Sequence, residues 1–110
     1  MADTTDTPVL DLLADMTAGS IEASSLDAQT LMLVRIAALV AVDAPPASYL
    51  LNLGAAADVD LGVEAVQGVL AAVAPIVGTT HIVSALSKIA LALDLELDLA
   101  EIDAEDDATT

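Results

Sequence analysis

The chain contains no cysteine, tryptophan or phenylalanine, and Tyr49 is its single aromatic residue. Thiol redox chemistry, disulfide bonds and thiolate metal sites are therefore excluded, because each of them requires a cysteine sulfur. With one aromatic ring, the chain also lacks the side chains on which nucleic-acid bases stack. These absences remove whole classes of function before any motif is considered.

Basic residues are almost as scarce, since the chain has 2 Lys and Arg residues against 18 Asp and Glu residues, a net charge of −16 at pH 7. A chain with this negative charge is repelled by phosphate backbones and by anionic lipid surfaces. We therefore expect it to bind neither nucleic acid nor membranes. The acidity suits either a high-salt interior or an ordinary solvated surface, and composition leaves both alternatives open.

Hydrophobic residues make up 56% of the 110 residues, which is enough for one small domain with a buried core. Arg35, Asp43 and Pro75 interrupt the apolar runs, so none reaches the roughly 18 to 20 residues of a membrane-spanning helix. Residues 1–7 contain two Asp and no basic residue, which is unlike a signal peptide. We therefore expect a cytoplasmic protein, and nothing in the sequence indicates a cofactor or a metal site.

Two segments in the first half of the chain show helical features. The first begins at Pro8 and is expected to stop at Gly19, with residues 20–25 as a linker. The second covers 27–42, and from 31 to 42 every position except Arg35 is apolar. A helix that is apolar on all sides is buried on several sides, so this segment predicts a central helix that also contributes to a subunit interface.

Three further helices are expected in the second half. They cover 46–57 and 63–77, and the last begins after Gly78. Asp60 is positioned to cap the helix over 63–77. The last two helices each carry an apolar stripe with spacings of three and four residues, and the very short loop between them predicts antiparallel packing.

The C-terminal tail gives a mixed signal, because residues 93–99 alternate apolar and acidic side chains at the spacing of a strand. Asp and Glu are poor strand formers, so we expect a helix end followed by an extended acidic arm, with 103–110 disordered. The predicted fold class is all-α, a compact bundle of about five helices. It comprises a short N-terminal helix and linker (1–25), a helical domain (26–94) and the acidic arm (95–110).

Several short runs between residues 26 and 93 together resemble one known family. They are Leu-Asp-Ala-Gln-Thr at 26–30, Pro-Ala-Ser-Tyr-Leu-Leu-Asn at 46–52, Gly-Val-Glu-Ala-Val at 62–66 and Ala-Pro-Ile-Val-Gly at 74–78. With the order of helices, the loop lengths and the glycine turn, they resemble the carboxymuconolactone decarboxylase family, in the alkyl hydroperoxidase D-like superfamily. The resemblance implies an all-helical fold and a homo-oligomer, commonly a trimer or hexamer.

Peroxidase members of that family carry Cys-x-x-Cys-x-x-x-His at the start of the third helix. Laid on this chain, the three positions fall at Pro45, Ser48 and Asn52, and the position of the helper glutamate falls near Leu33. Every component of the redox relay is therefore missing. The decarboxylase branch also lacks the cysteines, but its dicarboxylate substrate would meet few cations and a strongly negative field here, so we do not expect lactone decarboxylation.

Five residues are candidates for a pocket or ligand site. Arg35 is either an anion-binding group in a cleft or one half of an ion pair, including one across a subunit interface. His81 is either a general base or a surface or capping residue. Ser48, Tyr49 and Asn52 lie about one helical turn apart, so they either line a remnant of the family pocket or form the polar seam of an interface.

The leading interpretation is a non-redox oligomeric scaffold or small-ligand binder without an assigned catalytic residue. One alternative is a cysteine-free enzyme of the decarboxylase or isomerase type acting on a small carboxylated substrate. It requires Arg35, Asn52 and His81 to converge on one cavity. A further alternative is an acidic adaptor whose C-terminal tail binds a basic protein.

Overall fold

Five helices form the part of the chain that the computed structural model describes, namely the backbone of residues 7–109 and the side chains of residues 7–94. No strand occurs within that part, so the predicted all-α fold is confirmed. The helices are α1 (Pro8–Ala23), α2 (Ala28–Ala41), α3 (Pro46–Asp58), α4 (Val63–Val77) and α5 (Thr79–Thr109).

The helix ends follow from local chemistry. α2 begins where the Asp27 carboxylate accepts a hydrogen bond from the backbone N–H of Thr30 at 2.8 Å, which satisfies one free donor of the first turn. α3 begins with a proline in its first turn, where a missing N–H costs nothing. α4 ends at Gly78, whose φ of 84° is a conformation that a side chain disfavours. The predicted N-cap Asp27 and the predicted stop at Gly78 are both confirmed.

Two predicted boundaries are wrong. α1 continues through Gly19 to Ala23, because one glycine within a helix costs only about 1 kcal/mol and does not end it. The linker is correspondingly shorter, over 24–27. The N-cap of α4 is Gly62 rather than Asp60, which instead lies at φ 66° in the turn after α3.

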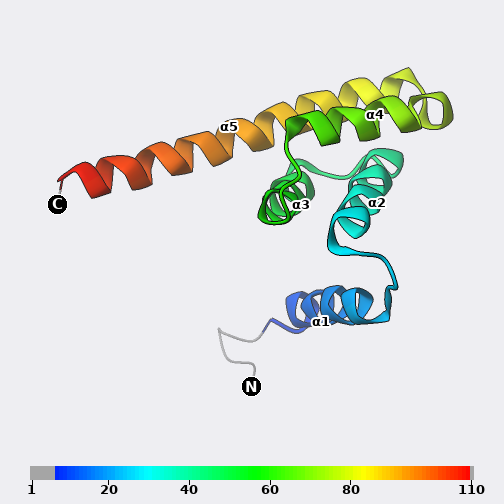
Figure 1. The fold of residues 1–110 in the computed structure, drawn as a ribbon, viewed down its shortest axis with the longest axis horizontal. Helices are drawn as coiled ribbons and strands as arrows, with labels where there is room; N and C mark the ends of the chain where they lie inside the picture. Colours follow the sequence, from blue (N-terminus) through cyan, green and yellow to red (C-terminus); the bar gives the residue numbers. More distant parts are fainter. Residues whose placement is uncertain (1–6, 110) are drawn as a thin grey trace.

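The expected extended arm is also wrong, since the backbone of 95–109 continues α5 as a helix. This segment is rich in Leu, Ala and Glu, which are good helix formers, and that preference outweighs the alternating pattern. Figure 1 shows α5 projecting beyond the other helices. The side chains of this segment, and Thr110, lie outside the described residues, and so does the proposed contact of the tail with a basic partner.

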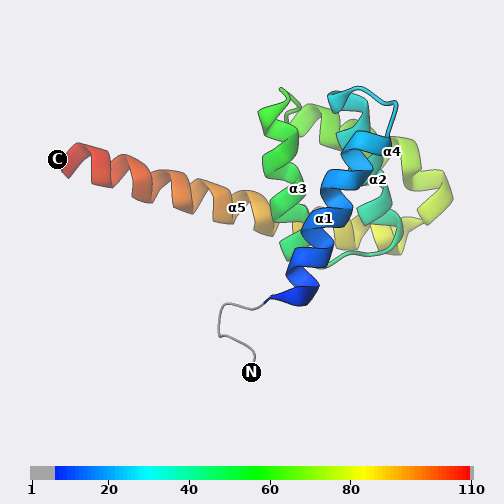
Figure 2. The same cartoon turned by 90° about the horizontal axis from the view of Figure 1, so that it is seen from below.

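The core forms around α2, which packs against α3, α4 and α5, while α5 also packs closely on α3. Ile36 and Val40 of α2 and Tyr49 of α3 are the largest fully buried side chains. α2 is therefore central, as expected, yet Val34 on the same helix stays 53% exposed. The chain reverses at Gly78, so that α5 runs back past α4 (Figures 1 and 2).

α1 stands apart from this core (Figure 1), and none of its residues is buried. Among the described residues, no helix combines the length and the apolar character that crossing a membrane requires.

Candidate functional site

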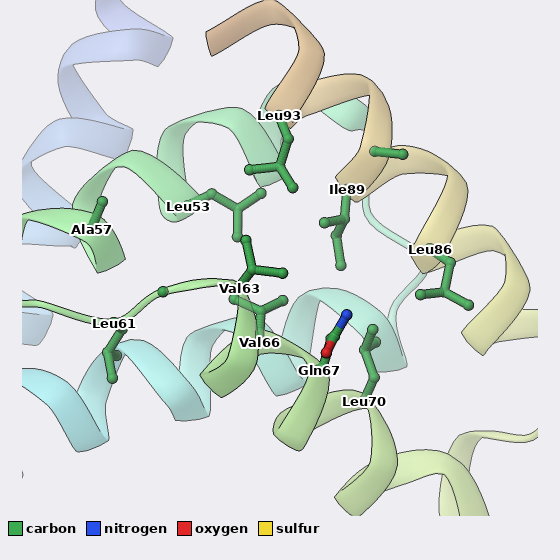
Figure 3. A pocket seen from close by; sticks show the side chains of 12 residues that line it. Leu53, Ala57, Leu61, Val63, Val66, Gln67, Leu70, Leu86, Ile89 and Leu93 are labelled. Atoms are coloured by element: carbon green, nitrogen blue, oxygen red, sulfur yellow. The ribbon is translucent and has the colours of Figure 1, made fainter. Parts of the chain in front are cut away.

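An apolar pocket of about 270 Å³ lies between α3, α4 and α5, where side chains from the three helices point toward one another (Figure 3). It is lined by Leu53, Ala57, Leu61, Gly62, Val63, Val66, Gln67, Leu70, Leu86, Ile89, Ala90 and Leu93. The two apolar stripes predicted on the last two helices supply much of this wall. The pocket therefore arises from the helical spacing of aliphatic residues, together with the loop that joins α3 to α4.

The pocket is deep on one side and open on the other. Val66, Leu70 and Ile89 are buried at its base, whereas Val63 and Leu86 are about half exposed, at 51% and 49%. Among the described side chains, Gln67 is the only polar one in the lining, and none of them that lines the pocket is titratable. The site can bury an aliphatic molecule and offer it one amide, but it provides no acid, base or nucleophile.

A second, shallower hollow of about 360 Å³ joins Arg35 and Asn52 between α1, α2 and α3. The half-buried Arg35 donates a hydrogen bond from Nη2 to the Ser20 hydroxyl at 3.1 Å. Among the described side chains, Arg35 forms no salt bridge. The Asn52 amide donates to the backbone carbonyl of Ser48 at 2.8 Å, which ties Asn52 to its own helix. Two of the five predicted site residues therefore share one hollow.

Tyr49 lies in the core and lines neither hollow. Its side chain is fully buried, and its hydroxyl has no hydrogen-bond partner among the described residues. Burial raises the pKa of Tyr49, and the nearby Asp43 carboxylate raises it further. Tyr49 is thus a packing residue with an unsatisfied hydroxyl. Ser48, the remaining candidate on this helix, is half-buried and contributes its carbonyl to Asn52.

His81 lies at neither hollow but near the turn between α2 and α3. There Asp43, at φ 53°, accepts hydrogen bonds on Oδ1 from the Ser84 hydroxyl at 2.6 Å and from Lys88 Nζ at 2.8 Å. Lys88 Nζ also donates to the Asp43 backbone carbonyl at 3.2 Å. These bonds, Lys88 first and Ser84 second, lower the pKa of Asp43, and the charge of His81 adds to the effect.

Sequence reasoning missed the Asp43–Ser84–Lys88 cluster, although one signal was present. Only two basic residues exist in this chain, so a partner for Lys88 among the many carboxylates was to be expected. The sequence separation of about forty residues concealed which carboxylate it is. The cluster joins α5 to the turn that follows α2, and it lies outside both hollows. Its role is therefore structural.

Arg35, Asn52 and His81 do not converge, because the hollow that holds Arg35 and Asn52 does not include His81. Within the described part of the chain, no three His, Asp or Glu side chains gather in a way that could hold a metal ion. No protein-family model, curated protein or solved structure matches the chain. The function is therefore inferred from the pocket and the polar clusters themselves.

Proposed function

We propose that this chain is a non-redox, homo-oligomeric helical protein that binds a small, neutral, largely aliphatic molecule in the pocket between α3, α4 and α5. The observation that carries the proposal is the lining of that pocket, in which Gln67 is the one polar side chain among 12 residues. An apolar cavity of 150 Å³ holds benzene, so about 270 Å³ suits a ligand on the order of ten non-hydrogen atoms.

The charge of the ligand follows from the lining. A charged group moved into an apolar site loses hydration and needs an opposite charge beside it. The described lining of this pocket contains no positively or negatively charged side chain. The overall charge of −16 disfavours an anion further. The Gln67 amide both donates and accepts, so it suits one oxygen of an alcohol, ketone or ester.

The absence of cysteine and of any titratable lining group supports binding rather than catalysis at this pocket. The five-helix order supports the proposal that the chain shares the fold of the carboxymuconolactone decarboxylase family, since the resemblance implies an all-helical protein. On that proposal the redox relay has been lost and the helical scaffold retained.

Titration with 1-octanol by calorimetry, with octanoate as the charged counterpart, tests the proposed ligand class. We expect saturable binding of 1-octanol, weaker binding of octanoate, and loss of 1-octanol binding in Ala57→Leu, because the larger side chain fills the pocket. Ala55→Leu is the matched control, since Ala55 is exposed on the same helix and lines no hollow described above. Equal binding of both probes, or full binding by Ala57→Leu, would refute the proposal.

A second candidate function, binding of a small carboxylate, is favoured by one observation. Arg35 is half-buried at the edge of a hollow, and among the described side chains its partner is the neutral Ser20 hydroxyl. A guanidinium in this position has donors left for a carboxylate. Octanoate binding that survives Ala57→Leu and disappears in Arg35→Gln would establish this site, and octanoate binding unaffected by Arg35→Gln would exclude it.

A further inference from the structure

Two apolar surfaces are left uncovered by the other described residues of the chain. One is the α2–α4 groove, a hollow of about 480 Å³ whose lining includes Leu33, Val34 and Ala37 of α2 and Ala65, Gly68 and Ala72 of α4. The other is the α1 stripe, which consists of Val9, Leu12, Leu13 and Met16, with Leu10 and Ile21 beside it. None of these residues carries a charge, so both surfaces are suited to contact with an apolar partner.

The α1 stripe needs a partner to be stable. All residues of α1 are exposed, and its six large apolar side chains are between 50% and 66% exposed. A 16-residue helix is marginal in water on its own, and most helices in proteins are stabilised by packing an apolar face. The contacts of α1 with its own chain occur in its C-terminal half, where Met16 and Ser20 line the Arg35 hollow, and they leave Val9, Leu12 and Leu13 exposed.

The α1 of the same chain does not cover the groove. It faces Arg35, Ala38 and Leu39 of α2 across the Arg35 hollow, whereas the groove is lined from α2 by Leu33, Val34 and Ala37. At about 100° per residue, these two sets lie on roughly opposite sides of α2.

We propose that α1 of a second copy of this chain docks in the α2–α4 groove. This inference rests on the homo-oligomeric part of the proposed function. Ala37, Ala65, Gly68 and Ala72 have small side chains, so a helix can approach the groove closely. A Cβ added at Gly68 would meet no atom within 4 Å, so packing within one copy leaves the space above this glycine open.

The buried area indicates a reciprocal exchange between two copies. The six apolar side chains of α1 expose on the order of 350 Å² in total, taking about 100 Å² for a fully exposed side chain. With an equal area from the groove, one contact buries about 700 Å², which is typical of crystal packing, whereas two reciprocal contacts bury about 1,400 Å². The second value lies within the range of stable interfaces, and a two-fold axis relates the contacts.

The test is the mass of the full chain in solution, measured by sedimentation at fixed salt for the wild type and three variants. Gly68→Gln places a larger uncharged side chain in the groove, and Leu12→Ser with Leu13→Ser weakens the α1 stripe. Ala71→Gln is the matched control, because Ala71 is exposed on α4 and lines none of the three hollows.

We expect a dimer, or an assembly built from dimers, for the wild type and for Ala71→Gln. For both the groove variant and the α1 variant, we expect the dissociation constant of the assembly to be at least tenfold higher than that of the wild type. Gly68→Gln should stay folded by circular dichroism, because glutamine is the better helix former and its Cβ meets no atom.

Three results would overturn the inference. If the wild type is a monomer at tens of micromolar, the proposed assembly does not form. A Gly68→Gln variant that keeps the wild-type mass shows that the groove is not the interface. Dissociation of Gly68→Gln but not of the α1 variant shows that something other than α1 occupies the groove. Binding of 1-octanol, measured on the same samples, reports separately on the pocket, which lies on a different face of α4.

Discussion

The buried hydroxyl of Tyr49 leads to a prediction about stability. The Tyr49 side chain has no exposed surface, and its hydroxyl lacks a hydrogen-bond partner within the described part of the chain. An unsatisfied buried polar group costs about 1 to 3 kcal/mol relative to its hydrated form. Tyr49→Phe keeps the ring and removes this cost, so we expect the free energy of unfolding to rise by about 1 kcal/mol and the Tm by about 4 °C.

The pH dependence gives a second readout for the same change. Burial, with the Asp43 charge as a smaller contribution, raises the pKa of Tyr49 above its ordinary value of 10.0. The native state therefore holds the phenolic proton at a pH where the unfolded chain has released it. The stabilisation is fully present below the unfolded pKa and is lost as the pH rises through the folded pKa. Tyr49→Phe should lack this part of the alkaline loss.

Chemical unfolding of both proteins measures both effects when it is done at about pH 8 and at about pH 11. These values lie below and above the pKa of about 10 at which tyrosine ionises in an unfolded chain. Tyr49→Leu is the control for the ring, and it should lose stability because a cavity forms in the core. A Tyr49→Phe variant that is less stable than the wild type by about 1 kcal/mol would refute the reasoning, because the hydroxyl would then have a favourable partner.

Three further perturbations follow from the core, the α4–α5 turn and the polar cluster. Ile36→Ala empties a fully buried site and should lower the free energy of unfolding by about 2 to 5 kcal/mol in urea titrations. Gly78→Ala forces a side chain into φ 84° and ψ 167° and should cost about 1 to 3 kcal/mol by the same measurement. The pKa of Asp43 is lowered by Lys88 and then Ser84, so its contribution is present above the ordinary value of 3.8 and is lost as the pH falls through the lowered pKa. Asp43→Asn should therefore flatten the fall of the thermal midpoint between about pH 6 and about pH 3.

The predictable features of the fold were those with a local cause. The N-cap at Asp27 and the stop at Gly78 each depend on a side chain and its immediate neighbours. The errors at Gly19 and over 95–109 arose where two local preferences compete, a helix breaker against continued helix in one case and strand alternation against helix formers in the other. Such competition is decided by small free-energy differences that a pattern does not measure.

The candidate site was less predictable than the fold. Arg35 and Asn52 do share a hollow, but His81 lies elsewhere and Tyr49 belongs to the core. Helical spacing places residues on a common face of one helix, yet it does not say which helix that face meets. The apolar pocket was missed for the same reason, since its lining consists of aliphatic residues that look like ordinary core positions in the sequence.

The order of residues alone is enough to say which chemistry this protein lacks and where most of its helices lie. An absent cysteine excludes thiol chemistry in any fold, and helical periodicity is a property of neighbouring residues. Three other features became clear from the packing of the helices: the stripes of α4 and α5 surround a pocket, Lys88 pairs with Asp43, and α1 packs no residue into the core. These features join residues far apart in the chain, and they depend on how all the helices share one limited core.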